Sequence, residues 1–181
     1  MAPFSIDFEW QSAPEYSHLS SEDAAIILDS GSLTSRLKEQ SNDFRVDVLQ
    51  EQWIAASQEH KKLLGQYCTQ LQCREVLLVC DDVARVYAQS WISTQASDLG
   101  VRQLGSKPLG EVLFQDKSWQ HTPLEVAQVD YPNALAPLLK DLHLPEQRLY
   151  ARRRVFVYQD AKIMVCEVFL PKVNYATQFA S

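Results

Sequence analysis

Two segments constrain the fold more than any other part of the sequence, 73–80 (CREVLLVC) and 163–170 (IMVCEVFL). Successive side chains of a β-strand point to opposite faces of the sheet. Each segment is therefore apolar on both faces, apart from Arg74 and Glu75 in the first and Glu167 in the second. Strands of this kind lie in the middle of a sheet that is covered on both sides. Because burying an unpaired charge is costly, the charges in these strands need partners.

Both segments belong to predicted hairpins, at 73–93 with a turn at 81–84 and at 149–170 with a turn at 159–161. Two further strands are predicted, at 44–53 and at 124–129, and residues 55–64 are expected to form a polar linker or a helix. Short helices are predicted at 24–28, at 33–40 with Ser32 as its cap, from Ser106 as cap onward, and at 133–142 within a long segment near the site.

Strands that come as hairpins separated by short helices are typical of an α+β fold with a single antiparallel β-sheet backed by helices. The chain length of 181 residues suits one domain, 1–181. Residues 1–18 are expected to be an irregular N-terminal lead-in.

Composition excludes several classes of protein. The net charge of −6 argues against a nucleic-acid-binding protein, which needs Lys and Arg to neutralise phosphates. The four cysteines form no C-x-x-C pair and the four histidines are scattered, so no metal site is expected. No apolar stretch approaches the length of a membrane span and no signal peptide is evident. These patterns predict a cytoplasmic protein. A monomer that acts on a small molecule is expected, although none of these patterns determines the oligomeric state.

Two interpretations of Arg74 and Glu167 remain open on spacing alone. In the structural interpretation they form a buried ion pair with each other, or each points outward at a strand end. In the functional interpretation they line an enclosed pocket and meet opposite ends of a small polar ligand.

Several segments, in this order along the chain, resemble the chorismate lyase family. They are LDSGSLTSRL (28–37), REVLLVCDD (74–82), VYAQS (86–90), LGSKPLGEVLF (104–114), LEVAQV (124–129), LYARR (149–153) and CEVFLP (166–171). The resemblance implies a buried ligand cavity and a cofactor-independent enzyme that cleaves chorismate to 4-hydroxybenzoate and pyruvate. It also implies a place at the first committed step of bacterial ubiquinone biosynthesis.

Residue by residue, the resemblance implies that Arg74 binds the ring carboxylate and that Glu167 meets the hydroxyl at the other end of the ring. It implies main-chain contacts to the ligand at Leu109 and Leu33. We therefore expect Arg74 and Glu167 to be separated by a ring-sized cavity. Both are the predicted catalytic residues.

The sequence departs from the family pattern at Gln89, where an arginine is common, and at Ser93, where a proline is common. A second cation for the enolpyruvyl carboxylate is then absent or supplied elsewhere, and Arg152 or Arg153 is the candidate. Gln89 and Arg152 are accordingly added to the predicted binding residues.

Three alternatives stay open. The first is a non-catalytic, effector-binding domain of the same fold. The second is a lyase with different regiochemistry on a chorismate-like enol ether, in which Gln89 would be the residue responsible for the difference. The third is a thiol enzyme that uses Cys166, although no histidine lies near it in the sequence.

Overall fold

One eight-stranded antiparallel sheet runs through the described chain, which comprises residues 1–13, 19–99 and 107–172 of the computed structural model. The strands are β1 (Gln11–Ser12), β2 (Phe44–Ala55), β3 (Gln70–Cys80), β4 (Val83–Ser93), β5 (Gln120–His121), β6 (Glu125–Val129), β7 (Leu149–Tyr158) and β8 (Ala161–Phe169). The helices are α1 (Ser21–Ile27), α2 (Leu33–Glu39), α3 (Gln58–Leu64), α4 (Thr94–Asp98), α5 (Leu109–Gln115) and α6 (Ala136–Asp141). The predicted α+β class is confirmed.

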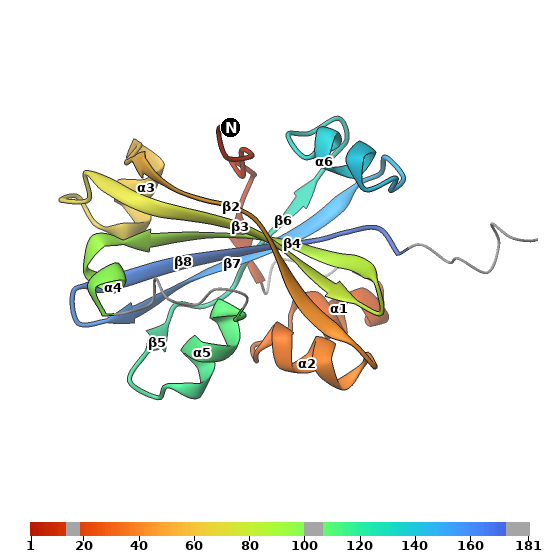
Figure 1. Cartoon of the computed structure of the whole chain (residues 1–181), viewed down its shortest axis with the longest axis horizontal. Helices are drawn as coiled ribbons and strands as arrows, with labels where there is room; N and C mark the ends of the chain where they lie inside the picture. The colour runs from red at the N-terminus through yellow and green to blue at the C-terminus, as the bar shows by residue number, and fades with distance from the viewer. Residues whose placement is uncertain (14–18, 100–106, 173–181) are drawn as a thin grey trace, which may run out of the picture.

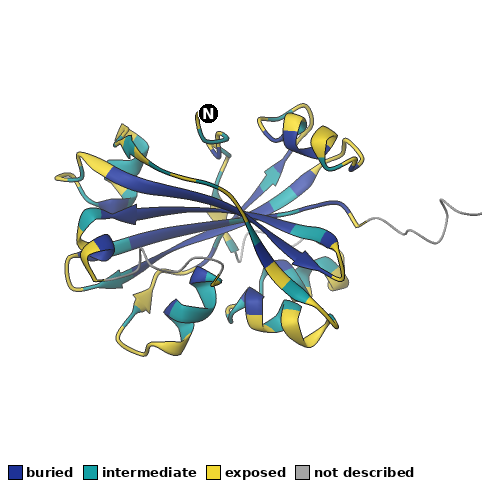
Figure 2. Ribbon diagram, viewed as in Figure 1, coloured by how far each residue is buried: buried dark blue, intermediate teal, exposed yellow. Residues whose placement is uncertain are grey.

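The two segments with apolar faces form central strands, as predicted. The order across the sheet is β1-β6-β7-β8-β4-β3-β2, with β5 paired to β7. Strand β3 therefore lies between β4 and β2, and β8 lies between β7 and β4. Figure 2 shows both strands buried along most of their length.

Helices cover both faces of the sheet but come from different parts of the chain. Helices α1, α2 and α5 lie on one face, and α3, α6 and the N-terminal segment lie on the other (Figure 1). We call these the α2/α5 face and the α3/α6 face. Each face has its own hydrophobic clusters, with Leu33 and Leu109 among those of the α2/α5 face.

The structure defines two predicted elements more closely. Of the two alternatives for residues 55–64, a polar linker or a helix, the structure shows helix α3, which Ser57 caps through a reciprocal pair of hydrogen bonds with His60. Helix α5 begins at Leu109 with Pro108 as its N-cap, and no side chain caps it. The predicted cap Ser106 lies outside the described residues.

The lead-in predicted to be irregular contributes to the fold. Gln11 and Ser12 form β1, which pairs with β6. Ile6 is buried, and Phe4, Phe8 and Trp10 pack against the same cluster on the α3/α6 face. The apolar residues of FSIDFEW alternate with period two, which is the signal of a segment that lays one side on a core.

A buried carboxylate holds the start of this segment on the sheet. Glu75 is fully buried on the α3/α6 face and accepts hydrogen bonds from the Phe4 main-chain N–H at 3.0 Å and from the Tyr87 hydroxyl. The Gln50 and Gln89 amides also donate to it. Burial, reinforced by the bond to Glu75, raises the pKa of Tyr87, so its hydroxyl remains a donor.

We expect Glu75→Ala to lower the free energy of unfolding by about 2–3 kcal/mol, because buried donors lose their acceptor. Urea unfolding followed by tryptophan fluorescence measures this change. Glu39→Ala, an exposed glutamate on α2, is the control and should change the free energy by less than about 0.5 kcal/mol. Equal, small effects of the two substitutions would refute the role given to Glu75.

Candidate active site

Two rows of side chains cross the α2/α5 face of the central strands. Residues directly opposite each other on paired strands place their side chains on one face. The first row is Glu51, Arg74, Ser90, Val165 and Arg154, and the second is Val76, Ala88, Glu167 and Arg152. The register therefore brings Arg74, Glu167 and Arg152 onto the same surface.

Small residues separate the two predicted catalytic charges. Ser90 and Ala88 on β4 lie between Arg74 on β3 and Glu167 on β8. From strand spacing and rise, the Cα atoms of Arg74 and Glu167 are about 12 Å apart. The two charges have different ion-pair partners, which disfavours the direct pair and matches the arrangement expected for opposite ends of a ligand.

Arg74 lies at the α5 end of this surface. Its Nε donates to Glu51 Oε1 at 2.7 Å, and its NH1 group donates to the Lys107 carbonyl at 3.4 Å. Only 3% of its side chain is exposed. Burial lowers the pKa of Arg74, and the charge of Glu51 opposes that shift. Because Lys107 is two residues before Leu109, Arg74 and the start of α5 are neighbours.

Glu167 is held by Arg152. The Arg152 Nε donates to Glu167 Oε2 at 2.6 Å, and the two side chains are 3% and 15% exposed. A charge-assisted hydrogen bond of this length is a strong one. Arg152, a predicted binding residue, thus lies on the same surface as the predicted catalytic residue Glu167 and is its direct partner.

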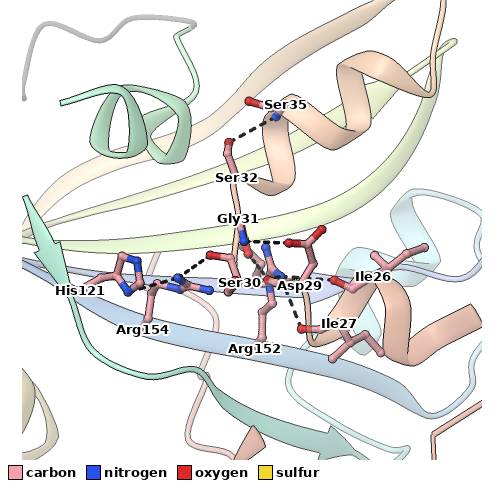
Figure 3. Close-up of polar contacts among 11 residues, drawn as sticks. Ile26, Ile27, Asp29, Ser30, Gly31, Ser32, Ser35, His121, Arg152 and Arg154 are labelled. Carbon is pink, nitrogen blue, oxygen red and sulfur yellow. Dashed lines mark hydrogen bonds and ion pairs between the residues drawn. The ribbon is translucent and has the colours of Figure 1, made fainter. Parts of the chain in front are cut away.

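Arginines of β7 also fix the connection between α1 and α2. The Arg152 NH1 group donates to the carbonyls of Ile26, Ile27 and Asp29, the last at 2.6 Å. Arg154 NH1 donates to the Ser30 carbonyl at 2.9 Å. Figure 3 shows both side chains pointing from β7 to this connection. Arg152, which holds Glu167, therefore also positions the connection that leads to α2.

Leu33 and Leu109 cover the surface from above. Leu33 is the first residue of α2 and clusters with Val76 and Ala88, whereas Leu109 is the first residue of α5 and clusters with Val165. A 2.6 Å ion pair between Lys38 and Glu111 joins the two helices. Leu33 thus lies over the row that contains Glu167, and Leu109 lies over the row that contains Arg74.

The predicted cavity is present only as a narrow space. A volume of about 10 Å³ is lined by Gly110, Phe114, Arg154, Val165 and Glu167, among others. Such a volume suits about one water molecule, whereas a cavity that binds benzene measures about 150 Å³. A ring can enter only if side chains or helices above the surface move.

A larger open cleft lies beside the site. It has a volume of about 620 Å³ between α1, α2 and the ends of β4, β7 and β8, and Phe169 is in its wall. Phe169 follows Glu167 by two residues on β8 and shares its face. The cleft therefore reaches the Glu167 side of the surface.

Gln89 does not join the other predicted site residues. It lies on the α3/α6 face, in the row Glu75, Gln89, Cys166 and Arg153. Its amide donates to the Phe4 carbonyl at 2.8 Å and to the Tyr87 hydroxyl, and its carbonyl accepts from Trp91. The structure gives Gln89 a place in the polar cluster around Glu75.

Arg153 and α6 also lie away from the site. Arg153 is on the α3/α6 face and pairs with Glu125 at 2.8 Å and Glu59 at 3.0 Å. The helix expected near the site within 130–147 forms as α6, but its leucines pack on the α3/α6 face. The long segment therefore supports the opposite layer of the molecule.

Sequence reasoning missed two members of the surface, Glu51 and Arg154. Arg154 follows Arg152 by two positions, so period two was a usable signal for a shared face. Glu51 is placed by the register between β2 and β3, which shifts between Val48 and Gln50. No sequence pattern reports such a shift.

Among the described residues, no group of three His, Cys, Asp or Glu side chains could hold a metal ion. Over the same residues, none of the helices has the length and apolar character that crossing a membrane requires.

Breaking the pair between Arg152 and Glu167 should be costly. We expect Arg152→Met to lower the free energy of unfolding by about 2–4 kcal/mol, because a largely buried carboxylate loses its cation. The double change Arg152→Met with Glu167→Leu should recover much of that loss. Both are measured by urea unfolding.

Arg148→Met is the matched control, since it removes an arginine whose pair with Asp130 is exposed. Its cost should stay below about 1 kcal/mol. Similar costs for the two single changes would contradict the buried-pair interpretation.

Comparison with solved structures shows the fold. The effector domain of PhnF from Mycobacterium smegmatis matches with a TM-score of 0.55 and 16% identity, over 79% of this chain and 90% of that one. The C-terminal domain of the histidine utilization repressor from Pseudomonas syringae matches with a TM-score of 0.55 and 10% identity, over 73% of this chain and 96% of that one.

Comparison with known sequences shows the family. A protein of Pseudoalteromonas translucida named "Probable chorismate pyruvate-lyase" is 43% identical over 93% of this chain and 95% of its own length. A protein of the same name from Idiomarina loihiensis is 37% identical over 93% of this chain and 88% of its own length. The sequence profile described as chorismate lyase matches residues 6–178. The prediction of an enzyme of this kind is confirmed, and the chain belongs to the chorismate lyase family.

Proposed function

We propose that the chain cleaves chorismate to 4-hydroxybenzoate and pyruvate on the α2/α5 face of its sheet. The observation that carries the proposal is the placement of Arg74 and Glu167 on one surface, about 12 Å apart, with only Ala88 and Ser90 between them on β4. Side chains this small leave room for a flat ring, once the cover above them moves.

Arg74 binds the ring carboxylate in this proposal. A guanidinium presents a planar fork that matches a carboxylate with two parallel hydrogen bonds and so fixes the direction of the ring. The contact between Arg74 and the Lys107 carbonyl sets this fork beside the start of α5. Leu109 is then placed for the main-chain contact that the family resemblance implies.

Glu167 meets the ring hydroxyl at the other end. As the anionic partner of Arg152, its carboxylate has acceptor oxygens only, so it accepts a hydrogen bond from the hydroxyl. Leu33 lies over the same row and is placed for its main-chain contact. Arg152 fixes the carboxylate and the connection leading to Leu33 together.

The chemistry suits a site that mainly orients its substrate. The bond between ring carbon C3 and the ether oxygen breaks, a hydrogen leaves C4, and the ring becomes aromatic. The released enol takes a proton on carbon and becomes pyruvate. The reaction is redox-neutral and aromatisation drives it, so positioning and placed charge supply the catalysis. The proposed reaction is therefore independent of a cofactor.

The pathway and assembly remain predictions. The resemblance implies the first committed step of ubiquinone biosynthesis in the bacterial cytoplasm, and a monomer is expected. The domain limits 1–181 also remain a prediction.

A non-catalytic effector-binding domain is the second candidate. The solved structures with this fold include a protein described as an effector domain. Incubation of the purified chain with chorismate, followed by pyruvate detection, separates the two functions. Chromatography of the aromatic product also tests the alternative of a lyase with different regiochemistry. Gln89 lies on the other face of the sheet, so it is not expected to change the regiochemistry.

A thiol mechanism has little support from the geometry. Cys166 is fully buried and its side chain lies on the face opposite to that of its neighbour Glu167. Burial raises the pKa of the Cys166 thiol, which keeps it protonated and unreactive.

We expect Glu167→Ala to lower kcat for pyruvate formation by about 100-fold or more, because the oriented acceptor is lost. Arg74→Ala should raise KM for chorismate by about 10- to 100-fold, because a charge-assisted carboxylate contact is lost. Cys166→Ser, the neighbour on the opposite face, is the matched control and should retain wild-type kcat. Near wild-type kcat in Glu167→Ala would remove the assigned role.

Gly110 gives an independent test of where the ligand lies. A Cβ added there would meet no described atom within 4 Å, and the residue lines the narrow space beside Glu167. We expect Gly110→Ala to stabilise the fold by up to about 1 kcal/mol, since glycine weakens helices. The same change should raise KM several-fold, because the methyl group occupies ligand space. A stability gain with unchanged KM would show that no ligand approaches Gly110.

A further inference from the structure

Three consecutive arginines of β7, Arg152, Arg153 and Arg154, are all buried, and they differ in how their charges are balanced. Arg152 pairs with Glu167, and Arg153 pairs with two glutamates on the opposite face. Arg154 has no carboxylate partner in the described part of the chain. Among these three, it alone makes no ion pair with a described carboxylate, and the charges of Glu167 and Asp29 act on it only without direct contact.

The contacts of Arg154 leave part of its guanidinium unused. Its NH1 group donates to the Ser30 carbonyl at 2.9 Å and lies 3.4 Å from His121 Nδ1. Its NH2 group is buried and has no hydrogen-bond partner among the described residues. The whole residue is only 5% exposed. Buried donors without partners are rare in native proteins, and one on a cation points to a group that is still to bind.

The surroundings of Arg154 disfavour its charge. Burial and, next, the positive charge of Arg152 lower the pKa of Arg154 to about 10, although the charges of Glu167 and Asp29 oppose this shift. Its guanidinium lies 5.4 Å from the centre of the Phe114 ring, which gives only weak compensation. An anion beside Arg154 would relieve both unfavourable effects.

The position of Arg154 relates it to the proposed substrate. It occupies the same row as Arg74, at the far side of β4 and β8, and it lines the narrow space together with Glu167 and Gly110. A ligand whose ring runs from Arg74 to Glu167 therefore ends near Arg154.

We propose that Arg154 binds the second carboxylate of the substrate, the one on the enolpyruvyl group. This inference rests on the proposed function. The enolpyruvyl ether is attached to C3, next to the C4 hydroxyl that meets Glu167, so its carboxylate lies beside the Glu167 end of the ring. Arg154 is a buried cation at that place, and its NH2 group has no hydrogen-bond partner among the described residues.

Arg152, which the sequence suggested for this role, already uses its donors for other partners. Its Nε binds Glu167, and its NH1 group binds the main-chain carbonyls of the connection before α2. Position 89 lies on the α3/α6 face, so Arg154 is the arginine of this surface that remains for the second carboxylate. After cleavage each product carries one carboxylate, 4-hydroxybenzoate at Arg74 and pyruvate at Arg154.

The test compares a ligand with two carboxylates to a ligand with one. KM for chorismate is measured by pyruvate release, and Kd for 4-hydroxybenzoate by calorimetry, on the full chain. Arg154→Gln should raise KM for chorismate by about 10- to 100-fold, because one charge-assisted contact is lost. Its Kd for 4-hydroxybenzoate should stay within about twofold of wild type, since that ligand makes no contact with Arg154.

Two further variants sharpen this comparison. Arg74→Gln should weaken both ligands, because both carry the ring carboxylate. Arg153→Gln is the matched control, a buried arginine next in sequence whose side chain lies on the other face, and it should leave the ratio of KM to Kd unchanged. Arg154→Lys keeps the charge but loses the planar fork. Its KM for chorismate should lie between that of the wild type and that of Arg154→Gln.

Each outcome decides the proposal. An equal loss of affinity for both ligands in Arg154→Gln, or an unchanged KM, would overturn it while the proposed function stands. If Arg154→Gln does not fold, the same ratio in Arg154→Lys decides. A wild-type chain that releases no pyruvate from chorismate would remove the proposed function and this inference together.

Discussion

A carboxylate buried in the middle of a sheet must have a partner, and the ion pair between Glu167 and Arg152 organises much of this molecule. Arg152 is opposite Glu167 on the neighbouring strand, and its other donors bind the carbonyls that precede α2. The position of the helix above the sheet is thus coupled to the position of the carboxylate. A change in one is transmitted to the other through a single guanidinium.

The alternation of side chains gives the two faces of the same strands different tasks. Glu75 on one face anchors the N-terminal segment through Phe4, whereas its neighbour Arg74 on the other face lies in the candidate site. Cys166 and Glu167 divide in the same way. Each central strand therefore carries stabilising contacts on one face and residues of the candidate site on the other, and charged side chains occur on both faces.

The sequence predicted the central strands, both hairpins and the charges of the site, because period-two patterns and buried charges are local signals. It could not place Gln89, since the register between β3 and β4 shifts between Leu78 and Val79. Counting residues through the turn between β3 and β4 therefore does not tell on which face of the sheet the Gln89 side chain lies. The partners of Arg74 and Glu167 depend on cross-strand register in the same way. The role of Phe4 and Ile6, by contrast, was readable from their alternation and was missed.

The negative net charge of the chain and the anionic substrate proposed for it are compatible for a physical reason. Charges on the surface are screened by salt over roughly 10 Å, whereas buried charges act in a medium of low dielectric constant. The affinity of the site for anions therefore depends on the balance of charge on the α2/α5 face. Within the two rows, Glu51 pairs with Arg74 and Glu167 pairs with Arg152, so Arg154 provides the excess positive charge there. A sequence-wide count of −6 contains no information about that excess.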